Sequence, residues 1–296
     1  MTQKTNLNIS PYYDDFDKDD QFYKVLFKPG FPVQARELTT LQSILQNQLE
    51  SFGTHMFKDG SMVIPGNIAY DPDYYSIKIE REFLGVPVSL YLDELKGKKL
   101  TSNVTGVSVV IDDYLYPEDN SQIDTLTIFV KYINSGPDNV DATMNDGESL
   151  ITDEAFVYGN TPVSAGESVL KLIDDEACFV GSSVSLAAGV YFIRGTFVEV
   201  AADKIVLNPY DNDPSYRVGL NINEQLLTAK QDESLYDNAR GFSNFAAPGA
   251  DRLKIETTLA KKELSDVNDT NFLELIRIDD GEIRFTADKS QYLSLI

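Results

Sequence analysis

The sequence predicts an α+β protein that is mainly antiparallel β, with an N-terminal arm and an amphipathic helix followed by β-rich domains. Three observations predict this class. One long segment near the N-terminus has helical periodicity, many short β-rich runs follow it, and the intervals between those runs rarely leave room for a crossover helix. Hydrophobic residues make up 42% of the 296 positions, which is enough to build a core.

The N-terminal arm interleaves aromatic residues with carboxylates in the run PYYDDFDKDD, residues 11–20. Such a segment cannot bury enough apolar surface to fold on itself, so we expect it to order against a neighbouring surface. Tyr12, Tyr13 and Phe16 are the candidate anchors, because aromatic side chains dominate the binding energy of interfaces. The alternative is that these rings cover the core of their own domain.

The same arm contains Asp15, Asp17 and Asp19, which match the alternating start of an EF-hand loop. The match fails at the sixth position, which is Asp20 instead of Gly, and at the twelfth, which is Leu26 instead of Glu. The sequence therefore predicts no metal site here, and it contains no phosphate-binding or dinucleotide-binding fingerprint, so we expect no cofactor.

The strongest helical signal spans residues 33–52, directly after turn residues at 28–32, and Gly53 is its expected stop. Apolar residues recur there at spacings of three and four. Two interpretations remain open: an ordinary amphipathic helix that lies on its own domain, or a helix that pairs with copies of itself. The candidate interface residues on this stripe are Leu38, Leu41, Leu45, Leu49 and Phe52.

After residue 60 the chain changes to short β-rich runs separated by Gly, Pro, Asn and Asp. A tight bend or bulge is expected at Gly195, which interrupts two apolar runs, and residues 92–96 are expected to form a short helical turn. The predicted strands are 61–64, 76–80, 86–91, 104–111, 126–133, 156–157, 168–173, 177–180, 190–194, 196–200, 204–207, 215–222, 253–261 and 271–278.

These patterns divide the chain into three modules. Residues 1–62 hold the arm and the helix, residues 63–208 form a β-rich body, and residues 209–296 form a smaller mixed β module. Because residues 291–296 end on apolar side chains without a capping turn, we expect a longer C-terminal part to follow.

Charge and composition exclude several classes of partner. The chain has 25 basic and 47 acidic residues, a formal net charge of −22, and no basic stripe, so we expect no binding to nucleic acid. No stretch approaches the roughly 20 apolar residues of a spanning helix, and the start lacks a signal peptide. We therefore expect a soluble protein without a membrane partner.

Few residues could support catalysis. The single cysteine, Cys178, lies in a strand-like run and is expected to be a buried small hydrophobe, and the single histidine, His55, is expected to be structural or solvated. Zinc sites, thiol pairs and Ser-His or Cys-His catalysis need residues that this chain mostly lacks. With 47 carboxylates any glycosidase pair can be nominated, so such a pair carries no information. We expect no enzymatic activity.

Several motifs, taken in order, resemble one known family. The run LFKPGFPVQARELTTLQSIL, residues 26–45, resembles the N-terminal signature of a family of virion structural proteins in tailed bacteriophages, often left as a domain of unknown function. The resemblance covers most of the chain and continues in residues 189–195, 214–220, 232–239 and 248–250.

The resemblance implies a baseplate component, or a part that anchors a tail fibre to the baseplate, made in the host cytoplasm and located in the virion. Its partners would be other tail and baseplate proteins, and by analogy with fibrous phage appendages we favour a homotrimer. It implies no catalytic residue. The alternative is a host-receptor-binding, adhesin-like tail protein, which the N-terminal position of the signature and the expected continuation disfavour.

Overall fold

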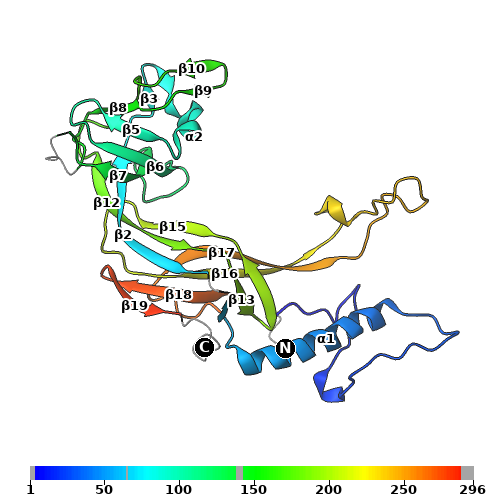
Figure 1. Ribbon diagram of the computed structural model, residues 1–296. Coiled ribbons are helices and arrows are strands. Elements are labelled where there is room, and N and C mark those ends of the chain that lie inside the picture. The colour runs from blue at the N-terminus through cyan, green and yellow to red at the C-terminus, as the bar shows by residue number, and fades with distance from the viewer. Residues whose placement is uncertain (1–3, 65, 138–142, 288–296) are drawn as a thin grey trace.

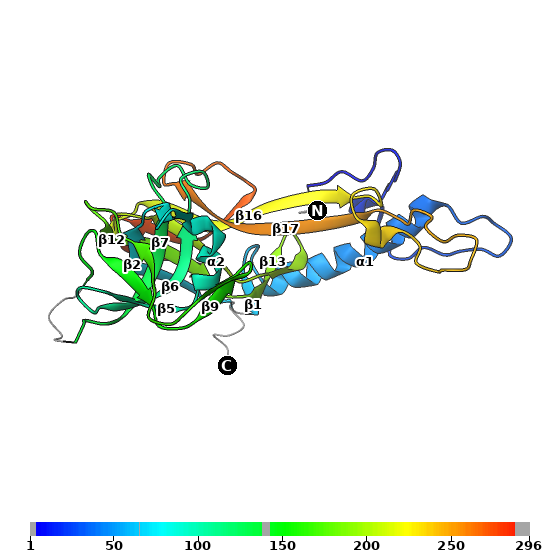
Figure 2. The same ribbon diagram turned by 90° about the horizontal axis from the view of Figure 1, so that it is seen from above.

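The computed structural model describes residues 4–64, 66–137 and 143–287 and consists mostly of antiparallel β structure with one long helix. The predicted α+β, mainly antiparallel β class is confirmed. A β-rich head lies at one end, and helix α1 (Ala35–Met56) and a long two-stranded ribbon extend away from it, as Figures 1 and 2 show. The run 291–296, from which a continuation was expected, lies outside the described residues.

The head is built on the largest sheet, whose eight strands within the described residues run in the order β11-β8-β5-β6-β7-β2-β12-β15, each antiparallel to its neighbours. Its core holds fully buried aliphatic side chains such as Leu100, Ile111 and Ile128. The strands are β2 (Ile68–Lys78), β5 (Lys99–Ser102), β6 (Ser108–Leu115), β7 (Thr127–Asn134), β8 (Ser149–Thr152), β11 (Ser168–Lys171), β12 (Cys178–Leu186) and β15 (Asp203–Asn208).

Short elements complete the head. Two hairpins are formed by β3 (Glu82–Phe83) with β4 (Val86–Pro87) and by β9 (Phe156–Tyr158) with β10 (Thr161–Val163). The strand predicted for 86–91 is wrong beyond Pro87, because 3-10 turn η2 (Val88–Leu90) and helix α2 (Leu92–Leu95) follow it. Val88, Leu92 and Leu95 recur at helical spacing and are all fully buried, so burial in the core favours turns over a strand. The helical turn predicted at 92–96 is confirmed.

A second layer joins strands from distant parts of the chain. One sheet contains β1 (Met62–Ile64), β13 (Gly189–Ile193) and β14 (Thr196–Val200), and another contains β17 (Arg252–Glu263), β16 (Tyr216–Leu227), β18 (Phe272–Asp279) and β19 (Glu282–Thr286). Met62, Tyr191, Leu220 and Leu275 belong to one core cluster. Residues on both sides of the boundaries expected near 62 and 208 therefore share a core.

The turn between β13 and β14 consists of Arg194 and Gly195, which have φ angles of 50° and 77°. A two-residue turn with positive φ at both positions matches the right-handed twist of the flanking strands. The tight bend predicted at Gly195 is confirmed.

The ribbon that leaves the head is formed by β16 and β17, which pair from Tyr216 opposite Glu263 to Leu227 opposite Arg252. Strand β18 covers β16 only as far as Asn221, so the outer part of the ribbon has two strands among the described residues. It runs beside α1 and ends in a loop, residues 228–251, that contains the 3-10 turn η3 (Glu233–Leu235) (Figures 1 and 2). We call α1, the ribbon and the arm before α1 the extension.

Helix α1 continues to Met56, so the stop predicted at Gly53 is wrong. Gly53 is buried against β13, where an added Cβ would lie 2.5 Å from Cε2 of Phe192. Glycine at this position permits close approach to another element and does not terminate the helix. At the other end, Gln34 donates its backbone N–H to Glu37 Oε2 at 3.0 Å and so caps the first turn, which is why the helix begins after the predicted residue 33.

Candidate interaction surface

Helix α1 directs most of its large apolar side chains away from the rest of the chain, with Ile44 the buried exception. Leu38, Leu45, Leu49 and Phe52 are between 49% and 65% exposed, and Leu41 is half-buried. These five residues, which we call the apolar stripe, lie on one face of a helix with 3.6 residues per turn. A surface helix ordinarily turns such a face toward its own core. The structure thus brings all five predicted helix residues together on one outward surface.

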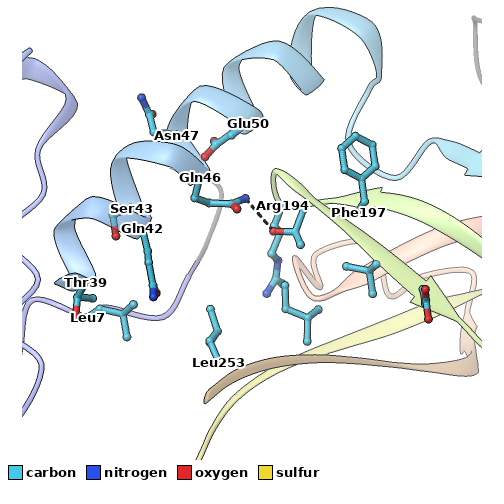
Figure 3. Close-up of a pocket in the computed structure, with 14 residues that line it drawn as sticks. Leu7, Thr39, Gln42, Ser43, Gln46, Asn47, Glu50, Arg194, Phe197 and Leu253 are labelled. Atoms are coloured by element: carbon cyan, nitrogen blue, oxygen red, sulfur yellow. Dashed lines mark hydrogen bonds between the residues drawn. The ribbon is translucent and has the colours of Figure 1, made fainter. Parts of the chain in front are cut away.

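The opposite, polar face of α1 contacts the body of the chain. Gln46 Nε2 donates to Gly195 O at 2.9 Å and reaches Thr196 Oγ1 at 3.2 Å, as Figure 3 shows for the second bond. Of the two buried residues of the helix, Gly53 packs on Phe192. The apolar stripe is therefore not the surface by which α1 is attached to its own chain.

The first part of the arm is bound to its own chain. The hydroxyl of Tyr12 donates to Asp251 Oδ2 at 2.6 Å, and this hydrogen bond to a carboxylate raises the pKa of Tyr12 above its ordinary value. Phe16 is half-buried, whereas Tyr13 is 56% exposed. Of the three predicted arm anchors, Tyr12 contacts the loop at the end of the ribbon and Tyr13 is open to solvent.

Two carboxylates hold the arm against α1. Asp14 is buried and accepts hydrogen bonds from Thr40 Oγ1 at 3.2 Å and from Ser43 Oγ. The next residue, Asp15, forms an ion pair with Arg36 in the first turn of the helix. These contacts cover the polar side of α1 and leave the apolar stripe open.

A buried ion pair joins the arm, the β13–β14 turn and the ribbon. The side chains of Arg194 and Glu224 are 6% and 4% exposed, and they are bonded to each other. Glu224 Oε2 also accepts from Thr5 N at 3.0 Å and Thr5 Oγ1 at 2.8 Å. Burial alone would raise the pKa of Glu224, but the hydrogen bonds from Arg194 and Thr5 outweigh burial and lower it.

This ion pair was not predicted from the sequence. One feature of the sequence could have indicated it, namely a charged residue next to an apolar run. Arg194 follows the run 190–193, and Glu224 comes shortly after the predicted strand 215–222. A charge at such a position also suits a solvated strand end, and nothing local links the two residues.

A second exposed apolar set precedes α1. We call residues 22–33 the aromatic segment. It projects beyond the first turn of the helix, as the blue loop in Figures 1 and 2 shows. Its large apolar side chains are 47% to 74% exposed and comprise Phe22, Tyr23, Leu26, Phe27, Phe31 and Val33.

A cleft of about 530 Å³ lies between α1 and the strands beside it. The helix lines it with polar side chains that include Gln42, Gln46 and Glu50 (Figure 3). The strands line it with mostly apolar side chains, among them Phe197 and Leu253. The cleft therefore has a polar wall and an apolar wall, and β14 contributes a large part of the second one.

The cysteine and the histidine lie apart from this cleft. Cys178 is half-buried in β12, where burial raises the pKa of its thiol to about 11 and keeps it protonated at neutral pH. His55 is exposed on α1, with Nδ1 2.7 Å from Ser51 O. Among residues 4–64, 66–137 and 143–287, no group of three or more His, Cys, Asp or Glu side chains is arranged to hold a metal ion. In the same residues no helix is long and apolar enough to cross a lipid bilayer.

Comparison with known proteins gives a match at the level of a family. A family model described as "Domain of unknown function (DUF4815)" matches residues 10–92 and 121–295, which is most of the chain. The matched residues include the arm from Ser10 onward, α1, β13, β14 and the ribbon. No curated protein and no solved structure matches.

Proposed function

The chain belongs to the DUF4815 family, and we propose that it is a structural component of a tailed phage particle that anchors a tail fibre to the baseplate or forms part of the baseplate. Its partners in this role are other tail and baseplate proteins and further copies of itself, with a homotrimer favoured. Its work is contact with these partners and not catalysis.

The observation that carries the proposal is the outward apolar stripe on α1. A monomeric protein rarely exposes contiguous apolar surface, so such a patch marks an interaction site. Complete burial of a leucine or phenylalanine side chain contributes about 1.5–3 kcal/mol. Four half-exposed side chains would therefore gain roughly 4 kcal/mol per copy when they are covered.

That gain alone gives weak association, because joining two molecules costs about 4–15 kcal/mol of translational and rotational freedom. A stable assembly needs further buried surface, and the exposed aromatic segment next to the stripe supplies it. The two surfaces are neighbours along the chain at the start of α1, so contacts between copies that cover both would bury more than a lone helix pair.

The assignment to a phage particle rests on the resemblance of residues 26–45 and the later motifs to virion structural proteins. The same residues form the second half of the aromatic segment and the first half of α1, where several large apolar side chains are at least 47% exposed. The resemblance and the exposed surface thus point to the same part of the chain.

The proposal is tested by locating the protein in particles. A phage whose genome encodes this chain with an epitope tag in the exposed loop after residue 264 is propagated, purified and labelled with immunogold. Labels should gather at the tail end where baseplate and fibres meet, and an untagged phage serves as the control. Purified particles that contain no tagged chain, or that carry the label only on the head, would refute the proposal.

A further inference from the structure

We propose that the aromatic segment of one copy adds to the free edge of β14 in a second copy, as an extra antiparallel or parallel strand that fills the cleft beneath α1. This inference rests on the self-association in the proposed function and names the contact that links the copies. It combines three features of the described residues: a strand edge outside any ladder, a segment whose backbone is outside any sheet, and complementary charges.

The edge of β14 is available for pairing. In the described residues β14 pairs with β13 on one side only, at the end of the sheet order β1-β13-β14. Ile193 and Thr196 flank the two-residue turn and so form a hydrogen-bonded pair. Because the pairs alternate along antiparallel strands, Phe197 and Glu199 direct their backbone N–H and C=O groups away from β13. An exposed edge of this kind is a template for another strand.

Side chains at this edge determine which kind of strand can pair with it. Phe197 and Glu199 are exposed and share one face of β14, since side chains alternate along a strand. Val198 lies on the other face in the core cluster with Tyr191. All three β14 residues line the cleft, so an added strand would meet apolar surface and the carboxylate of Glu199.

The cationic residue in the cleft is already neutralised. Arg194 lines the cleft but forms the buried ion pair with Glu224. The carboxylate of Glu199 therefore sets the charge at the exposed edge, and a basic partner is favoured over an acidic one.

The aromatic segment has the properties that this edge requires. Residues 22–28, FYKVLFK, are extended without regular secondary structure, and a hydrogen bond within the segment joins Phe31 N to Lys28 O at 3.3 Å. The alternation puts Lys24, Leu26 and Lys28 on one side of an extended chain. In a chain with a net charge of −22, residues 22–33 contain two lysines and no acidic residue.

Pairing of the aromatic segment with β14 would bring complementary side chains into contact. The lysine-bearing side of the segment would lie on the face of β14 that carries Phe197 and Glu199, so leucine meets phenylalanine and ammonium meets carboxylate. The other side, which includes Tyr23 and Phe27, would face the cleft wall beneath α1. Backbone hydrogen bonds would supply affinity and these side-chain contacts would supply register.

A second copy is the better donor because the chain's own segment points elsewhere. It projects beyond the first turn of α1, whereas β14 contacts the middle of that helix, where Gln46 Nε2 reaches Thr196 Oγ1 at 3.2 Å (Figures 1 and 2). At 1.5 Å per residue, Ala35 and Gln46 are roughly 17 Å apart along the helix axis. A segment that comes from a second copy can reach the edge of β14 while the arm of each copy keeps its conformation.

Cross-linking between different copies tests the proposal. In a Cys178→Ala background, chains with Lys24→Cys are mixed with chains carrying Glu199→Cys, dissociated, reassembled and oxidised. We expect a disulfide-linked dimer of one chain of each kind, identified by mass spectrometry on a non-reducing gel band. The control replaces Glu199→Cys with Glu94→Cys, an exposed position on the head, and should give at least tenfold less of the linked species.

The possible failures are distinguishable. Light scattering that shows an oligomer without the 24–199 link would overturn the strand exchange and leave the proposed function standing. A chain that is monomeric at every concentration and in mixtures with its partners would remove the self-association on which both rest. A double variant, Lys24→Cys with Glu199→Cys, that links only within one chain would also overturn the proposal, because the segment would then occupy its own cleft.

Discussion

The head and the extension use large apolar side chains in opposite ways. In the head, Leu100, Ile111 and Ile128 are fully buried, and exposed apolar residues such as Leu84 and Val104 occur singly in separate turns. In the extension, the apolar stripe and the aromatic segment are exposed and adjacent along the chain. The head is thus completed by its own contacts, and the extension has apolar surface left for partners.

The comparison also shows how an extension with an open apolar surface keeps its shape. Besides the packing of Gly53 on Phe192, its links include polar ones: Gln46 bonds to the β13–β14 turn, Asp14 bonds to Ser43, and Arg194 pairs with Glu224. Directional bonds of this kind fix geometry without using the apolar side chains.

Replacing Glu224→Gln should lower the free energy of unfolding by about 4 kcal/mol, because it leaves the charge of Arg194 buried without its partner. Urea denaturation measures the change. The matched control is Glu282→Gln, which breaks the exposed pair with Arg284 and should cost no more than about 1 kcal/mol. Equal effects of the two variants would mean that the buried pair does not hold the extension.

A leucine in each region gives a direct contrast. Leu100→Ala should lower the free energy of unfolding by about 3 kcal/mol through the cavity left in the head. Leu49→Ala should change the stability of the dissociated chain by less than about 0.5 kcal/mol, since the side chain is half exposed and alanine favours helix. The comparison fails if Leu49→Ala is as costly as Leu100→Ala in dilute, monomeric protein.

Gly53→Ala tests how closely α1 approaches β13. Alanine is about 1 kcal/mol better than glycine within a helix, but overpacking against a buried ring costs about 1–3 kcal/mol. The added Cβ would meet Phe192, which is fully buried, so we expect a net loss of about 1 kcal/mol in urea denaturation. A gain in stability would show that the helix is not packed on β13 in solution.

Asp112 provides a test of the head by pH. Burial would raise the pKa of its carboxyl, but hydrogen bonds from Lys204 and Tyr74 outweigh burial and lower the pKa to about 2. Its contribution to stability is therefore present above pH 4 and is lost as pH falls from about 4 to about 2. Asp112→Asn should be less stable at pH 6 and should have a smaller loss of stability over that interval, as measured by urea midpoints at pH 6, 4 and 2. Parallel curves for the two proteins would contradict this role.

Features set by local pattern were predictable from the sequence. The spacing of Leu38, Leu41, Leu45 and Leu49 predicted α1, and the glycine between two apolar runs predicted the turn at Gly195. Both depend on residues within a few positions of one another. The β-rich class followed in the same way from alternation and short intervals.

Features set by distant partners were not predictable. Gly53 lies within the helix, and its lack of a side chain suits the close approach of Phe192, which is far along the chain. In the sequence, Glu224 and Arg194 have the pattern of solvated charges at strand ends, and only the fold shows that their side chains are buried together. The residues of the stripe were predicted, but only the position of α1 relative to β13 shows that the stripe faces outward. The free edge of β14 depends on the order of strands in the sheet, which no local pattern contains.

The central claim is that the apolar stripe is an interface, and light scattering over a range of protein concentrations tests it most directly. The wild-type chain should form a closed oligomer, with a trimer favoured. Leu45→Asp with Leu49→Asp should abolish self-association without loss of β circular dichroism, and Ser51→Asp with Thr54→Asp, an equal change of charge on another exposed side of α1, should leave it intact. Unchanged assembly of the stripe variant, or equal loss in both, would contradict the claim.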